Sequence, residues 1–88
     1  MSEKQFAGSK ILLVEDEETL AVGLEYNLSD EGYNVTWAKD GNEALDKYNQ
    51  EEFDLIILDI MLPYYDGFEV ADRIRSDSPQ MPILMLTA

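Results

Sequence analysis

The chain has 88 residues, of which 45% are hydrophobic, and its 19 acidic and 6 basic residues give a net charge of −13. This length suits one small domain, and the hydrophobic content suits a globular chain rather than a disordered one. So acidic a surface repels phosphate, which argues against direct binding of nucleic acid and favours cations and basic partner surfaces.

Some residue types are missing, and each absence excludes a class of site. Since the sequence has neither cysteine nor histidine, it offers no disulfide, no thiolate metal site and no imidazole catalysis. No apolar run approaches the roughly 20 residues that span a bilayer, and the first residues lack the apolar core of a signal peptide. We therefore expect a soluble protein of a reducing cytoplasm, with no membrane association.

The pattern divides the chain into a mobile N-terminal tail, residues 1–9, and one domain over residues 10–88. The domain opens with a predicted strand over 10–14. Leucines at every fourth position predict a helix over 17–31, because residues four apart share one face of a helix. Aromatic and apolar residues then alternate with polar ones over 33–38, which is typical of a half-exposed strand at the edge of a sheet.

The second half continues the alternation of strand and helix. An acid followed three residues later by glutamate predicts helix starts at Asp40 and Asp66, because the two side chains can cap the first turn. Residues 53–58, with the apolar run 55–58, and residues 82–87 predict strands buried on both faces, as in a parallel sheet. The order β-α-β-α-β-α-β therefore predicts an α/β fold with right-handed crossovers.

Acidic side chains follow two of the predicted strands. Glu15 and Asp16 come directly after the first strand, and Asp59 follows the apolar run 55–58. Each acid alone is most simply a capping or turn residue. Adjacent parallel strands lie about 4.8 Å apart, so carboxylates at their ends would repel by about 3 kcal/mol per pair at an effective dielectric of 20. A divalent cation reverses that cost, and oxygen ligands suit Mg²⁺ or Mn²⁺.

Other chemistries lack their residues. The first strand is not followed by the glycines and lysine of a P-loop, and the acids there would repel a flavin phosphate. An aspartyl phosphatase of the haloacid dehalogenase type needs a second aspartate at the position of Met61, and nothing indicates the sugar cleft of a glycosidase. Thr87 ends a strand as Asp59 does. Its hydroxyl could reach a group carried on Asp59, or it could be a β-branched residue that merely suits a strand.

These residues resemble a known family, the receiver domain of two-component response regulators. The match runs over residues 10–88 and includes the acidic pair Glu15 and Asp16, the strand-end Asp59, the loop 61–63 with Gly67, and the strand end 86–88. The stretch 59–69 is most similar to receivers of winged-helix transcription regulators. The resemblance implies a flavodoxin-like three-layer sandwich with strand order 2-1-3-4 and a site between strands 1 and 3.

The resemblance also implies a role for each site residue. Asp59 would accept a phosphoryl group from a histidine kinase. Asp16 and Asp59 would bind Mg²⁺, with Glu15 assisting directly or through water and Met61 contributing its backbone carbonyl. Thr87 would hydrogen-bond the phosphoryl oxygens and couple phosphorylation to conformation. The domain would be a phosphorelay switch rather than an enzyme, since phosphoryl transfer needs positioning and charge neutralisation more than covalent machinery.

The family pattern continues beyond residue 88 with a helix, a fifth strand and a final helix, so we expect a receiver truncated after its fourth strand. The lysine that the family carries on the fifth strand is missing, which predicts slow or undetectable phosphorylation by a small phosphodonor. Ile83–Leu86 would become an apolar edge strand, which predicts a homodimer or larger assembly through this strand. The rival hypothesis is a self-assembling half-domain that serves only as an interaction module.

Overall fold

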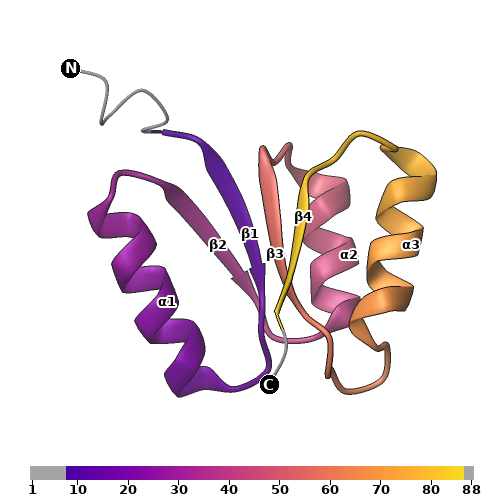
Figure 1. Ribbon diagram of the computed structural model, residues 1–88, viewed down its shortest axis with the longest axis horizontal. Coiled ribbons are helices and arrows are strands. Elements are labelled where there is room, and N and C mark those ends of the chain that lie inside the picture. Colours follow the sequence, from indigo (N-terminus) through magenta and orange to yellow (C-terminus); the bar gives the residue numbers. More distant parts are fainter. Residues whose placement is uncertain (1–7, 87–88) are drawn as a thin grey trace.

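The computed structural model describes residues 8–86, in which strands and helices alternate as the sequence predicts. Its strands are β1 (Lys10–Val14), β2 (Asn34–Ala38), β3 (Leu55–Asp59) and β4 (Ile83–Leu86). Its helices are α1 (Glu18–Asp30), α2 (Gly41–Gln50) and α3 (Gly67–Asp77). The strands pair in parallel in the order β2-β1-β3-β4 (Figure 1). The predicted α/β fold and strand order are therefore confirmed.

Helices cover both faces of the sheet and create three layers. Helix α1 lies on one face against β1 and β2, whereas α2 and α3 lie side by side on the other face (Figure 1). A hydrophobic core lies on each face of the sheet, and β1 contributes to both. Leu12 and Val14 pack on the face of α2 and α3. Ile11 and Leu13 pack on the other face, with Ala21 of α1. A strand that is apolar at every position fits only a sheet covered on both faces. Among the described helices, none has both the length and the apolar character that crossing a bilayer requires.

The two edge strands differ in how well they are covered. Strand β2 is mostly half-buried, as the alternation of its residues predicts. Strand β4 is apolar throughout, yet 52% of the Leu84 surface is exposed. Leu84 pairs with Ile57, which belongs to the core on the α1 side of the sheet. Helix α1 lies over β1 and β2 rather than over β4, so no helix within residues 8–86 covers Leu84 on that face.

Helix α1 shows how local sequence sets the helix ends. Glu17, predicted as its first residue, is instead the N-cap, and its carboxylate accepts the N–H of Leu20 at 2.9 Å. At the other end Gly32 adopts a φ of 99° and donates its N–H to the carbonyl of Ser29 at 3.0 Å. Glycine adopts this left-handed conformation without steric cost, so Gly32 ends the helix and turns the chain toward β2.

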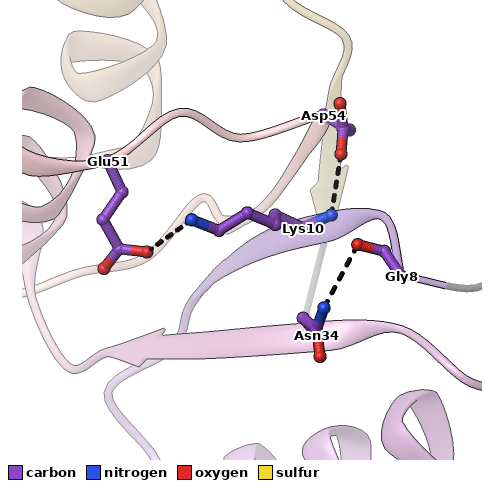
Figure 2. Close-up of polar contacts among 5 residues, drawn as sticks. All are labelled: Gly8, Lys10, Asn34, Glu51 and Asp54. Atoms are coloured by element: carbon purple, nitrogen blue, oxygen red, sulfur yellow. Dashed lines mark hydrogen bonds and ion pairs between the residues drawn. The ribbon is translucent and has the colours of Figure 1, made fainter.

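Polar contacts connect the amino-terminal ends of the strands (Figure 2). These ends lie opposite the strand ends that carry the acids. The backbone N–H of Lys10 donates to Oδ2 of Asp54 at 2.8 Å, and Nζ of Lys10 lies 3.1 Å from Oε1 of Glu51. Nδ2 of Asn34 donates to the carbonyl of Gly8 at 3.2 Å. These contacts join the beginnings of β1, β2 and β3.

The contact between Lys10 and Asp54 explains why β3 begins later than predicted. The sequence predicts a strand over 53–58, whereas β3 runs from Leu55 to Asp59. A side-chain carboxylate, rather than a backbone carbonyl, accepts the N–H of Lys10, so the regular ladder between β1 and β3 starts one residue further on. At the other end Asp59 belongs to the strand itself, because it pairs with Leu86 of β4.

The predicted tail, residues 1–9, lies outside the described residues except for Gly8 and Ser9, and its mobility stays a prediction. Gly8 donates its N–H to the carbonyl of Gly32 at 2.8 Å, and the carbonyl of Ser9 accepts the N–H of Asn34 at 2.9 Å. These two residues therefore extend the contact between β1 and β2.

Candidate metal centre

Three acidic side chains meet at the carboxyl end of the sheet. Glu15 and Asp16 follow β1 directly, and Asp59 is the last residue of the neighbouring strand β3. One carboxylate oxygen from each acid lies within 4.8 Å of those of the other two. The parallel pairing of β1 with β3 therefore brings together the three acids that the sequence places on one rim.

The first two acids differ sharply in their surroundings. Glu15 is only 3% exposed, whereas Asp16 is exposed. The N–H of Glu15 donates to the carbonyl of Ala38 at 3.0 Å, and its carbonyl accepts the indole N–H of Trp37 at 2.7 Å. Its Oε2 accepts the N–H of Glu17 at 3.0 Å. The backbone of Glu15 thus continues the contact between β1 and β2, and the chain turns outward at Asp16.

The electrostatics of the cluster are unfavourable without a cation. Burial raises the pKa of the Glu15 carboxyl, and the charges of Asp59 and Asp16 raise this pKa further, partly offset by the hydrogen bond from Glu17. Like charges this far apart repel by about 3 kcal/mol at an effective dielectric of 20. Within residues 8–86, the ion pair between Lys10 and Glu51 is the only one, and it lies at the other end of the sheet.

The raised pKa of Glu15 predicts a pH dependence that Glu15→Gln removes. Between the ordinary value of 4.5 and the higher folded-state pKa, the folded protein binds more protons than the unfolded chain, so wild-type stability falls as pH rises through this window. In buffer free of divalent cations, we expect Glu15→Gln to match the wild type near pH 4 and to be more stable by about 1–3 kcal/mol at pH 7.5. Urea unfolding at several pH values measures the difference.

The control for this comparison is Glu52→Gln, because Glu52 is an exposed acid outside the cluster. We expect its stability difference from the wild type to stay within about 0.5 kcal/mol across the same pH range. If the stability difference between Glu15→Gln and the wild type also stayed constant with pH, repulsion within the cluster would be too weak to favour a bound cation.

Asp59 and Met61 are joined by the turn that follows β3. Oδ1 of Asp59 accepts the backbone N–H of Met61 at 3.1 Å, which restricts rotation of the carboxylate. The side chain of Met61 is 69% exposed, so only its backbone is held beside the site. A ligand role for the Met61 carbonyl stays a prediction. Thr87 lies outside the described residues, although the preceding Leu86 pairs with Asp59 in the sheet.

Gly67 lets helix α3 pack closely against the end of β3, which the sequence alone does not predict. Gly67 is the buried first residue of α3, and its N–H donates to the carbonyl of Ile60 at 2.7 Å. A Cβ at this position would overlap the carbonyl oxygen of Asp59 and would lie 2.7 Å from Cα of Ile60. Only glycine therefore lets α3 approach the end of β3 so closely.

The loop after Asp59 forms an apolar margin beside the acids. A hollow of about 550 Å³ lies next to the cluster and is lined by Asp16, Asp66, Phe68 and residues 60–63. The side chains of Met61 and Phe68 are largely exposed around it. Exposed apolar groups beside a charged site are typical of surfaces that partner proteins contact.

The donor set of the cluster fits a hard divalent cation. It consists of carboxylate oxygens alone, and Mg²⁺ prefers oxygen ligands at about 2.0–2.1 Å while keeping several waters. Neighbouring oxygen ligands of such an ion are about 3 Å apart and opposite ones about 4.2 Å, so the oxygens of the cluster, which lie within 4.8 Å of one another, would have to move closer or bind the ion through a bridging water.

A family model described as the response regulator receiver domain matches residues 11–88 of this chain. The chain belongs to the response regulator receiver family. This receiver domain is 53% identical over 79 residues to the alkaline phosphatase synthesis transcriptional regulatory protein PhoP of Bacillus subtilis (strain 168). The alignment covers 90% of this chain and 33% of that protein. The expected likeness to receivers of transcription regulators is therefore confirmed.

Solved receivers share this fold. The non-phosphorylated HemR receiver domain of Leptospira biflexa superposes with a TM-score of 0.87 at 42% identity, covering 91% of this chain and 64% of that chain. The response regulator TrrA of Thermotoga maritima, in complex with Mg²⁺ and BeF, gives a TM-score of 0.88 at 41% identity, covering 91% and 70%. Receivers are signalling modules of phosphorelays; histidine kinases phosphorylate them, and they bind Mg²⁺ at an acidic pocket.

Proposed function

We propose that this receiver domain is a Mg²⁺-dependent phospho-acceptor in which Asp59 takes the phosphoryl group from a histidine kinase. The observation that supports this function is the convergence of Glu15, Asp16 and Asp59 within 4.8 Å. Asp16 and Asp59 would hold the ion, Glu15 would assist, Met61 would add its carbonyl, and Thr87 would hydrogen-bond the phosphoryl oxygens. The domain would act as a switch and not as an enzyme, in a cytoplasmic location.

The residues around Asp59 suit nucleophilic attack on phosphorus. Oδ1 accepts the N–H of Met61 and would keep a second lone pair for the ion, while Oδ2 would attack the phosphorus of a phosphohistidine. A P–O bond then forms as the P–N bond breaks, and the leaving imidazole takes up a proton. Bound Mg²⁺ supplies charge neutralisation for the transferred group and for the clustered acids. The apolar margin beside the cluster gives a kinase a surface to contact.

A calorimetric titration with Mg²⁺ tests the proposed function. We expect one site of millimolar or tighter affinity, weakened at least about 10-fold in Asp59→Asn, because the amide carries no charge to the ion. Asp72→Asn, a change to an exposed acid outside the cluster, should bind as the wild type does. The absence of binding by the wild type, or equal binding by Asp59→Asn, would contradict the proposal.

Acetyl phosphate should modify Asp59 only slowly, as measured by intact-mass spectrometry. The reason is that no lysine or arginine within residues 8–86 forms an ion pair with the acids of the cluster.

A second candidate function, self-assembly through β4, is favoured by the exposure of Leu84. This leucine is 52% exposed on an edge strand that is apolar throughout, and such edges invite pairing with another chain. We propose that two copies pair their Ile83–Leu86 strands across a two-fold axis. Since each copy carries a net charge of −13, the association should strengthen with salt.

Sedimentation velocity at micromolar concentration measures this assembly. We expect a dimer or larger species for the wild type and a shift to monomer in Leu84→Lys, because a charged side chain on an edge strand opposes pairing. The control is Tyr26→Lys, which places the same charge on an exposed position of α1. A stable wild-type monomer at all salt concentrations would rule out assembly through β4.

A further inference from the structure

Trp37 connects the acidic turn to the neighbouring strand. Its indole Nε1 donates a 2.7 Å hydrogen bond to the backbone carbonyl of Glu15, across 22 residues of sequence. Trp37 belongs to β2 and pairs with Leu13 of β1. Its ring packs on the core at the α1 side of the sheet. The side chain therefore extends from a strand interior to the peptide that precedes Asp16.

This bond completes the attachment of the Glu15 backbone to β2. The carbonyl of Ala38 accepts the N–H of Glu15 at 3.0 Å, so consecutive residues of β2 hold both backbone groups of Glu15. The carbonyl of Glu15 and the N–H of Asp16 belong to one planar peptide unit. Holding that carbonyl therefore fixes the direction in which the chain enters Asp16.

Asp16 depends on this attachment because little else restrains it. Its side chain is exposed, and none of the hydrogen bonds within residues 8–86 involves its carboxylate. Glu15, by contrast, is buried and its carboxylate accepts the N–H of Glu17. A metal ligand that is free to move loses more entropy on binding than one already in place, so support for its backbone raises affinity.

We propose that Trp37 is a positioning residue for the cation site: its indole N–H holds the peptide between Glu15 and Asp16 so that Asp16 faces the ion together with Asp59. This inference rests on the proposed function. It goes beyond satisfying a half-buried indole N–H, which any nearby carbonyl would do, because the acceptor is the peptide that directs Asp16. A second consequence is that Mg²⁺ binding changes the fluorescence of Trp37, the only tryptophan of the chain.

The test removes the N–H while keeping the ring. Replacement of Trp37 by the isosteric benzothienylalanine does so, because sulfur takes the place of the indole N–H. Trp37→Phe also removes the N–H but leaves a single, smaller aromatic ring. We expect both proteins to bind Mg²⁺ about 3- to 10-fold more weakly by calorimetry, in line with the loss of one hydrogen bond. The control is Tyr33→Phe, a change to another aromatic residue that packs on the same core, which should leave the affinity unchanged.

The outcomes separate this inference from the proposed function. If the wild type binds Mg²⁺ and both proteins without the N–H bind equally well, the inference is overturned while the proposed function stands. If the wild type does not bind Mg²⁺, the proposed function and the inference fall together. Should Trp37→Phe fail to fold, the benzothienylalanine protein decides, because its ring preserves the packing. Wild-type fluorescence that does not change at saturating Mg²⁺ would also count against the inference.

Discussion

Alanine at position 67 is expected to destabilise the fold by about 3 kcal/mol, at the upper end of what overpacking usually costs. The new Cβ would overlap the carbonyl oxygen of Asp59 and would lie 2.7 Å from Cα of Ile60. Both contacts involve backbone at the end of β3, which cannot yield without moving the strand or α3. Since a domain of this kind has about 5–15 kcal/mol of stability in total, Gly67→Ala should unfold at much lower urea concentration.

The matched control is Gly23→Ala in the middle of α1. A Cβ at Gly23 meets nothing within 4 Å, and alanine favours a helix by about 1 kcal/mol over glycine. The two substitutions are chemically identical, yet their effects should have opposite signs. Equal effects of Gly67→Ala and Gly23→Ala on the urea midpoint would contradict the close approach of α3 to Asp59.

Asp59→Asn is expected to stabilise the protein without divalent cations and to remove most of its stabilisation by Mg²⁺. The amide can still accept the N–H of Met61 through Oδ1, while repulsion from Glu15 and Asp16 is lost. Removing about 1–3 kcal/mol of repulsion should raise the melting temperature by about 4–8 °C for each kcal/mol in a domain of this size. The wild type should gain about 1.4 kcal/mol when Mg²⁺ reaches ten times its dissociation constant.

Calorimetric melting with a chelator measures the stability of the metal-free protein, and melting with Mg²⁺ measures the stabilisation by the ion. The exposed acid Asp72, changed to asparagine, serves as the control and should melt like the wild type under both conditions. Destabilisation of the metal-free protein by Asp59→Asn would show that the carboxylate stabilises the fold in its own right. The cluster would then be a structural feature rather than a site kept for a cation.

The sequence predicts the sheet because its periodicities are unambiguous. Residues 11–14 are apolar at every position, which requires cover on both faces, and such cover is what α1 and the pair α2 and α3 provide. The alternation over 33–38 likewise predicts an edge strand, and β2 lies at an edge. The convergence of the acids follows from the same argument, since neighbouring parallel strands end at one rim.

What the sequence does not predict depends on contacts between distant segments. Glu15 and Asp16 are adjacent acids of similar type, yet one is buried and the other exposed, because Glu15 alone continues the pairing with β2. The bond from Trp37 to Glu15 joins residues far apart in sequence, and alternation places Trp37 on an edge strand without indicating its acceptor. The need for glycine at position 67 likewise comes from the approach of α3 to Asp59.

Anomalous diffraction from crystals grown with Mn²⁺ tests the shared cation site most directly, because Mn²⁺ takes the same oxygen ligands as Mg²⁺ and can be located by its own scattering. If the three acids share one cation, we expect one strong anomalous peak at the carboxyl end of β1 and β3, about 2.1 Å from carboxylate oxygens of Asp16 and Asp59, with Glu15 beside it. A peak elsewhere on this acidic surface, or no peak between these residues at saturating Mn²⁺, would contradict a shared site.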